Sequence, residues 1–410
     1  MTASNLTIAT EWRRATLGIA DGLAAAVAAA LPWSTSATGI LIALWLMASL
    51  PTLDAATLRR DLTSAAGGLP VLLALLGIAG LFWADTSATE RLRGVEPFVR
   101  LLMIPLLFVQ FRRSDHATWV AAAFLASSTV LLATSLLMIL FVYQNGHGPG
   151  VPIRDYMSQS GMFVLCGFGL LDFAVGTVVR RPIVGTACAA LGLLFLADIA
   201  YVSTSRTTLV IIPVLYVVWG LHRLAWKQLV GFLLAGLVLA AGLWIAAPEV
   251  REHLNKIPAE IAEHEATGAN TSSGARLEFW KASLDILREA PLFGHGTGTI
   301  AETFRQHASA ADSAPATNPH NQLFAIGIQI GALGMAALLA MWGAHFQLFL
   351  SRGPWIGLMA VTQNIVGSLF NSHLMDFTQS WVYVFAVGVF GGLALRNPPP
   401  SPRKDVGPSP

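Results

Sequence analysis

Apolar runs alternate with short polar connections along most of the chain. The runs are roughly 17 to 25 residues long, the length that crosses the hydrocarbon core of a bilayer. The first run has the length of a signal-peptide core, but because further spans follow closely we expect a membrane helix. The pattern predicts an all-α polytopic integral membrane protein. Its twelve expected spans lie near Ala15–Leu31, Ala37–Leu50, Leu69–Trp83, Val95–Phe111, Thr118–Tyr143, Ser160–Val179, Ile183–Val202, Thr207–Leu221, Gln228–Ala247, Gln322–Leu350, Trp355–Phe370 and Trp381–Leu395.

One long hydrophilic segment, Pro248–Pro319, interrupts this series of spans. It begins with an apolar stripe at helical spacing, formed by Val250, Leu254, Ile257 and Ile261. Pro258 lies inside the stripe, so we expect a kink or two helical pieces. A second helix is predicted over Ala275–Ala290, and Pro291 ends it. The segment is therefore expected to carry short helices.

Basic residues fall in alternate connections, and this bias sets the expected orientation. The clusters are Arg13 and Arg14, Arg59 and Arg60, Arg112 and Arg113, Arg180 and Arg181, Arg223 and Lys227, Arg352, and finally Arg396, Arg403 and Lys404. With twelve spans they all lie on one side, the cytoplasm, and both termini are cytoplasmic. We expect a nine-span region over 1–247, a periplasmic loop over 248–319, a three-span region over 320–396 and a disordered cytoplasmic tail over 397–410.

Composition narrows the class of protein further. The chain is 54% hydrophobic and 12% charged, whereas a soluble protein carries about 25% charged residues. The net charge of +2 gives no case for nucleic-acid binding, which needs a concentrated basic face. Cys166 and Cys188 are expected to differ in membrane depth by roughly 12 Å, too far for a disulfide. Both are therefore interpreted as packing residues.

Two arginines on the outer side are candidates for anion binding. Arg206 lies in a very short connection between two apolar spans, where a charge needs a partner. The alternative is an arginine that reaches the lipid headgroups. Arg276 opens the helix predicted over Ala275–Ala290, beside its apolar stripe. A helix N-terminus favours anions, and a guanidinium fork matches phosphate. The alternative is an ordinary surface arginine.

His320 is the candidate for proton transfer. It lies in Asn318-Pro319-His320-Asn321, where the long loop enters the tenth expected span. A histidine at the membrane edge can take or hold a proton near neutral pH. The alternative is a residue that only caps the helix or bonds locally.

Other polar groups are weaker candidates for substrate contacts. The run Gly294–Gly298 includes His295, but because no βαβ unit surrounds it, we interpret it as a tight turn rather than a dinucleotide site. The outer loop that holds Asn371, Ser372, His373 and Asp376 could line the same cavity or cap helices. The row Glu263–Glu265 points in different directions on a helix and makes a poor metal cage. We expect no metal and no cofactor.

The order of features over the last half of the chain resembles the bacterial O-antigen ligase family, within the group that includes O-antigen polymerases and protein O-oligosaccharyltransferases. The first half matches only as generic membrane helices. The features that carry the resemblance are, in order, Ser205-Arg206-Thr207 at a helix start, Arg276 and Trp280 in the large loop, Pro291-Leu292-Phe293-Gly294-His295-Gly296, His320-Asn321, and Gly327 and Gly331.

The resemblance implies a glycosyltransferase with a fold of the GT-C kind that needs no metal. Such ligases move O-antigen polysaccharide from undecaprenyl diphosphate to the lipid A–core oligosaccharide at the periplasmic face of the bacterial inner membrane. It also implies that Arg206, Arg276 and His320 are the essential residues. Expected substrate contacts are Asn321, Arg288, His295, His373 and Asp376. Expected partners are the two lipid-linked substrates and the membrane lipids, without nucleic acid.

The chemistry of the residue types agrees with this implication. Guanidinium groups can neutralise the charge that grows on a lipid diphosphate as it leaves. A histidine can remove the proton of an attacking sugar hydroxyl, and a single displacement would invert the anomeric centre. An O-antigen polymerase or a protein O-oligosaccharyltransferase fits the same residues. A transporter, from a different class, is less favoured because the largest polar mass is a loop outside the membrane.

Overall fold

The computed structural model describes residues 3–143, 146–269, 271–307 and 316–396, and every regular element in these ranges is helical. The predicted disordered tail, 397–410, lies outside the described residues. The elements are α1 (Ala3–Ala30), α2 (Thr35–Ser49), η1 (Leu50–Thr52), α3 (Ala55–Leu62), α4 (Ala65–Ala79), η2 (Gly80–Phe82), α5 (Ala88–Arg100), α6 (Met103–Phe111), α7 (Ala117–Leu140), α8 (Tyr156–Thr177), α9 (Pro182–Tyr201), α10 (Arg206–Arg223), α11 (Trp226–Ala246), α12 (Pro248–Thr267), α13 (Ser272–Glu289), α14 (Ile300–His307), α15 (Gln322–Arg352), α16 (Trp355–Ser368) and α17 (Phe377–Arg396).

Eight helical segments of the described chain are long and apolar enough to cross a membrane. They are Thr35–Thr52, Ala65–Phe82, Ala117–Leu140, Tyr156–Thr177, Pro182–Tyr201, Trp226–Ala246, Gln322–Ser351 and Phe377–Arg396. The prediction of an all-α, polytopic membrane protein is therefore confirmed. The apolar part of α1, Ala15–Ala30, is shorter, so the count of twelve spans stays a prediction.

The prediction of one continuous span over Val95–Phe111 is wrong, because the helix breaks between α5 and α6. Pro105 has no amide hydrogen to donate to the Leu101 carbonyl one turn earlier. That carbonyl instead accepts from the Ile104 amide at 3.2 Å, in a tighter turn. The proline thus divides an apolar run that hydropathy alone reads as a single span.

The long helix α15 is also broken, at Gly331, where φ is +66°. The loop before α14 fills this break. His295 and Gly296 donate their backbone amides to the carbonyls of Ile328 and Gln329 at 2.8 and 2.9 Å, and Ala332 donates to the Pro291 carbonyl at 2.8 Å. The predicted tight turn is confirmed, since Gly294, Gly296 and Gly298 all have positive φ. Its backbone lies against another stretch of backbone, so the turn has a packing role.

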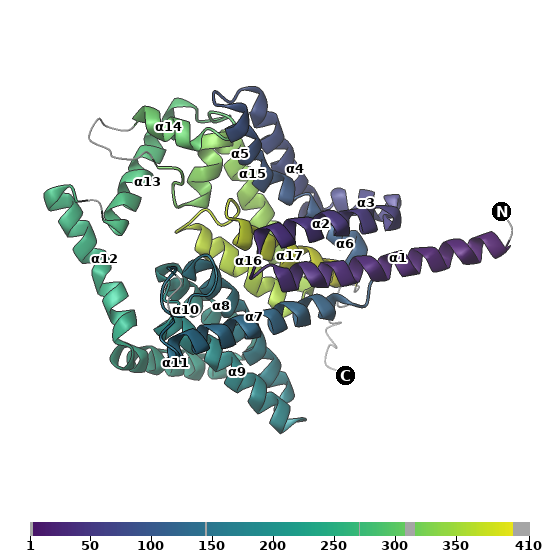
Figure 1. The fold of residues 1–410 in the computed structure, drawn as a ribbon, viewed down its shortest axis with the longest axis horizontal. Helices are drawn as coiled ribbons and strands as arrows, with labels where there is room; N and C mark the ends of the chain where they lie inside the picture. Colours follow the sequence, from purple (N-terminus) through teal and green to yellow (C-terminus); the bar gives the residue numbers. More distant parts are fainter. Residues whose placement is uncertain (1–2, 144–145, 270, 308–315, 397–410) are drawn as a thin grey trace, which may run out of the picture.

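The loop helices follow the sequence closely. α13 confirms the helix predicted over Ala275–Ala290. α12 continues through Pro258 as one element, which excludes the alternative of two separate pieces. Figure 1 shows α12 at the edge of the molecule, joined to the rest through α11 and α13, while α16 and α17 lie in the middle. Cys166 and Cys188 are both free, as expected.

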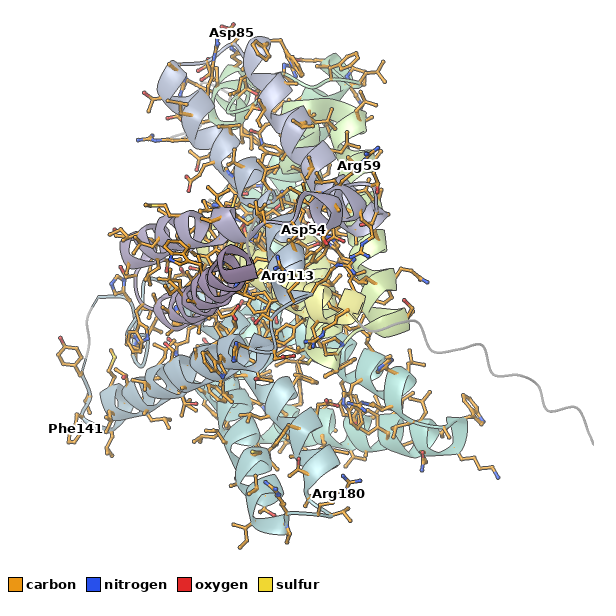
Figure 2. All side chains as sticks on the ribbon, turned by 90° about the vertical axis from the view of Figure 1, so that its right-hand side faces the viewer. Asp54, Arg59, Asp85, Arg113, Phe141 and Arg180 are labelled. Atoms are coloured by element: carbon orange, nitrogen blue, oxygen red, sulfur yellow. The ribbon has the colours of Figure 1, made fainter. Side chains whose placement is uncertain are left out.

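The two ends of α17 lie at opposite sides of the membrane region. Its last turn meets a basic cluster, where Arg112 donates to the Leu395 carbonyl at 2.6 Å and pairs with Asp61 at 2.6 Å. Arg113 donates to the Thr52 carbonyl at 2.7 Å and lies near Asp54, as Figure 2 shows. A 20-residue helix is about 30 Å long. The start of α17, after Asp376, is therefore separated from this basic cluster by about the thickness of a bilayer core.

Candidate functional site

Five helices begin around one polar region. They are α8, α10, α13, α15 and α17. The starts of α8, α10 and α17 line one small polar pocket together with Gln363, Asn371 and His373. Because the first turn of a helix leaves amide groups unbonded and carries partial positive charge, such a region favours an anion.

Arg206 is the first residue of α10 and is held by a rigid turn before it. Ser203 donates its amide and its hydroxyl to Asp198, both at 2.9 Å. The Arg206 guanidinium makes a two-pronged pair with the Glu260 carboxylate of α12, at 2.9 and 2.6 Å. Both side chains are about 20% exposed. This pairing argues against the alternative of an arginine that simply reaches the lipid headgroups.

Arg276 lies one turn into α13, close to Arg206. Burial lowers the pKa of its guanidinium, and the positive charge of Arg206 lowers that pKa further. Glu260 and Tyr156 oppose the effect, so both lie near the same pair of arginines. The arginine is half-buried, which argues against an ordinary surface residue. Arg276 thus lies close to a second guanidinium, whose carboxylate partner is Glu260.

His320 lies beside Arg276, in an uncommon backbone conformation with φ of +52°. Its amide donates to the Asn318 side-chain oxygen at 2.9 Å, which fixes the turn that places the ring. The ring stacks on Phe279 of α13 with centroids 6.2 Å apart and planes 17° from parallel. A non-glycine residue at positive φ is strained and persists where the surrounding contacts impose it.

The hydrogen bonds around His320 determine which ring nitrogen carries the proton. The Asn318 oxygen accepts from the His320 amide and from the Ser372 hydroxyl, so the Asn318 amide nitrogen is the donor to the Asn371 oxygen at 3.2 Å. That Asn371 oxygen also contacts His320 Nδ1 at 3.2 Å. Since an amide oxygen only accepts, Nδ1 carries the hydrogen and the lone pair is on Nε2.

The electrostatic surroundings of His320 favour its neutral form. Burial lowers the pKa of the imidazole, the charge of Arg276 lowers it further, and the hydrogen bond to Asn371 raises it. Because the net direction is downward from 6.5, the ring is neutral at pH 7. A neutral imidazole with a lone pair on Nε2 can accept a proton.

The weaker candidates divide between two places. His373 lines the polar pocket, and burial lowers its pKa to about 4. Asp376 lies next to it before α17, where burial raises the pKa of the carboxyl. Arg288 is instead exposed and pairs with Asp285. Arg288 lies about 18 Å along α13 from Arg276. His295 contacts the Ile286 carbonyl at 3.0 Å, and Asn321 caps α15. The structure places His373 in this pocket and Asp376 beside it, through Gln379. His295 and Asn321 make contacts that support the fold, and Arg288 lies on the exposed surface, away from Arg276.

Sequence reasoning missed two residues that the structure adds to the site. Tyr156 opens α8 and lies near both arginines. Glu260 pairs with Arg206 from α12. The spacing contains a weak signal for Glu260, since it is three residues after Ile257 and therefore on the apolar face of its helix. In the described parts of the chain, no group of three metal-ligating side chains lies together.

These features define a multi-pass membrane protein in which two half-buried arginines and a histidine lie close together at one end of its helices. The family model described as O-antigen ligase matches residues 191–339, a stretch that holds Arg206, Arg276 and His320. The match covers somewhat over a third of the chain and confirms the resemblance to the O-antigen ligase family. It supports an O-antigen-ligase-type function and a glycosyltransferase-like enzyme.

A curated relative is similar over a shorter stretch. An uncharacterised protein of Haemophilus influenzae is 28% identical over 120 residues, which cover 28% of this chain and 30% of that protein. The chain thus spans about a third of the length of this relative. The specific donor and acceptor are a matter for proposal.

Proposed function

We propose that this protein is an O-antigen ligase of the bacterial inner membrane. It transfers O-antigen polysaccharide from undecaprenyl diphosphate to the lipid A–core oligosaccharide, with its site facing the periplasm and both termini in the cytoplasm. The observation that carries the proposal is the meeting of Arg206, Arg276 and His320 within one polar region at the helix ends. The two arginines bind the donor diphosphate, and the histidine activates the acceptor.

The donor's leaving group accounts for the two arginines. As the bond between the sugar's anomeric carbon and the phosphate oxygen breaks, the electron pair goes to the diphosphate. Guanidinium groups that are already in place stabilise this charge without reorganisation. Arg276 is half-buried beside Arg206, so an incoming dianion relieves a repulsion between two cations. This contribution grows as negative charge develops, which is the condition for catalysis.

The acceptor accounts for His320. A sugar hydroxyl is a poor nucleophile until a base removes its proton. Nε2 of His320 takes that proton as the hydroxyl oxygen bonds to the anomeric carbon, and the imidazolium later returns it to water. Asn371 keeps Nδ1 protonated and so holds the base in the productive tautomer. Displacement in one step inverts the anomeric centre.

Three acceptors separate this proposal from its nearest alternatives. Purified protein in nanodiscs receives a lipid-linked glycan donor together with lipid A–core, a second lipid-linked glycan, or a serine-containing protein. Transfer to lipid A–core, seen as a glycan ladder on that lipid, is the expected result. Transfer to the second glycan alone indicates an O-antigen polymerase, and transfer to protein alone an O-oligosaccharyltransferase. Lys281→Ala, an exposed change on the same helix as Arg276, is the control that keeps wild-type activity.

A further inference from the structure

The Glu260 carboxylate lies where an anion would bind Arg206. Both of its oxygens accept from the guanidinium, at 2.9 and 2.6 Å. This is the fork geometry that arginine uses for carboxylate and phosphate alike. An anionic ligand that engages Arg206 in the same way must first replace this carboxylate.

Ser273, at the start of α13, completes the surroundings of that carboxylate. Its amide and its hydroxyl donate to Glu260 at 3.0 and 2.6 Å. The Ser273 oxygen in turn accepts from Arg206 at 2.8 Å. These hydrogen bonds, with Arg206 foremost, lower the pKa of Glu260 to about 2. The carboxylate is therefore charged at any physiological pH, and protonation cannot release it.

Glu260 can leave this position without disturbing the packed core. Figure 1 shows α12 at the edge of the molecule. Its apolar cluster lies near its start, where Val250 is buried with Ala200 and Ala247. Further along, α12 contacts α13 and the turn before it through polar groups, where Thr271 donates to the Glu260 carbonyl and His264 pairs with Glu278. Glu260 lies more than two turns further along, and most of its neighbours on α12 are exposed. A change of side-chain rotamer is enough to move the carboxylate into water.

We propose that Glu260 is a built-in competitor, whose carboxylate competes with the donor phosphate for Arg206 and so sets the affinity of the site for its donor. The proposal rests on the proposed function, in which Arg206 binds the donor. The ion pair between Arg206 and Glu260 sets a cost that every anion must meet before it binds Arg206. This common cost lowers the affinity for a monophosphate and for a diphosphate by a similar factor.

Removal of the negative charge of Glu260 separates two possible roles. A competitor for Arg206 would weaken donor binding, so its loss strengthens binding, whereas loss of a residue that positions Arg206 weakens it. Glu260→Gln keeps the size of the side chain and its hydrogen-bonding oxygen but loses the negative charge. If Glu260 competes, the full-length variant in nanodiscs binds farnesyl diphosphate roughly 3- to 30-fold more tightly than wild type. Farnesyl monophosphate is expected to gain by a similar factor, because the cost that is removed is common to both anions. In turnover, the KM for the lipid-linked donor falls while kcat changes little.

Two further variants isolate the charge as the cause. Glu263→Gln removes an exposed carboxylate from the same helix and is expected to bind both probes as wild type does. Glu260→Asp keeps the charge and is expected to bind both probes about as weakly as wild type does. Weaker or unchanged binding in Glu260→Gln overturns the proposal, and so does a Glu260→Asp variant that behaves like Glu260→Gln.

The two proposals fail in different ways. If wild type transfers glycan but Glu260→Gln does not bind the diphosphate probe more tightly, the competition is wrong and the ligase function stands. If wild type transfers no glycan to any of the three acceptors, the ligase function is wrong. The probe measurement needs no acceptor, so tighter binding of the diphosphate in Glu260→Gln supports the competition whichever acceptor the enzyme uses.

Discussion

Replacement of His320 tests the proposed mechanism most directly. General-base catalysis by a positioned side chain contributes about 10²- to 10⁴-fold, so His320→Ala is expected to lower kcat by roughly that range. The diphosphate contacts are on α10 and α13, so donor binding is expected to persist. His320→Gln can hydrogen-bond but cannot accept the proton, and is expected to lose a similar factor.

The pH dependence of the transfer rate gives a second test of His320. Catalysis needs the neutral imidazole, so activity falls as the pH drops below the pKa of His320. Burial and Arg276 lower that pKa from 6.5, which places the acidic limb of the rate profile below pH 6.5. Asn371→Ala removes the hydrogen bond that raises the pKa of His320, so the acidic limb of this variant's rate profile moves to lower pH. Arg276→Lys keeps the charge and is expected to move the limb little.

The assay follows initial rates of glycan transfer from lipid-linked donor to lipid A–core between pH 5 and 8. Farnesyl diphosphate binding is measured in parallel, to separate catalysis from donor affinity. A His320→Gln variant with near wild-type turnover would refute the role as base. An acidic limb that survives unchanged in His320→Ala would assign the titrating group to another residue.

The remaining predictions concern the arginines, the metal, the fold and the topology. Arg206→Ala and Arg276→Ala are each expected to abolish transfer while the protein stays folded, and lysine is expected to restore only part, because a point charge cannot reproduce the guanidinium fork; wild-type rates in either alanine variant would remove that residue from the diphosphate site. Transfer is expected to continue in excess chelator, and its loss with rescue by a divalent ion alone would contradict the arginine mechanism. Gly331→Ala is expected to lower stability by about 1–3 kcal/mol, because φ is +66° and the added carbon would lie 2.3 Å from the Leu292 carbonyl carbon. Gly343→Ala, in open space on the same helix, is the control, and equal melting temperatures for the two variants would show that the break bears no strain. A reporter that is active only outside the cytoplasm, inserted near Thr267, is expected to be active, and silence there would reverse the orientation.

The sequence predicted most helix positions because an apolar run must satisfy its own backbone within a membrane. It also predicted that Arg206 has a partner, since a charge in a very short connection between apolar spans requires one, and the pair with Glu260 confirms this. The identity of that partner could not be predicted. Glu260 lies 54 positions away, and its place depends on how α12 packs. Ordinary helical spacing gives that information only for residues within one or two turns.

The breaks in the helices were hidden from the sequence for a related reason. Gly331 interrupts α15 at a point where its carbonyls are bonded by the loop around His295, more than 30 positions earlier. A hydropathy window records only that the run is apolar. The tautomer of His320 likewise depends on Asn318 and Asn371, which come from two separate connections. Such arrangements follow from tertiary contacts and not from local pattern.

The backbone hydrogen bonds between the loop around His295 and the broken α15 limit how this protein can be recombined with its relatives. In hydrocarbon, each unpaired backbone group costs several kcal/mol. The two halves of α15 therefore depend on hydrogen bonds with the backbone of Pro291, His295 and Gly296. Because that loop precedes α15 in the chain, it is synthesised before α15 and is available to bond α15 as that helix forms. A chimera that exchanges the large loop must carry 291–298 and both halves of α15 as one cassette, and a boundary placed between them would leave a transmembrane helix with a gap.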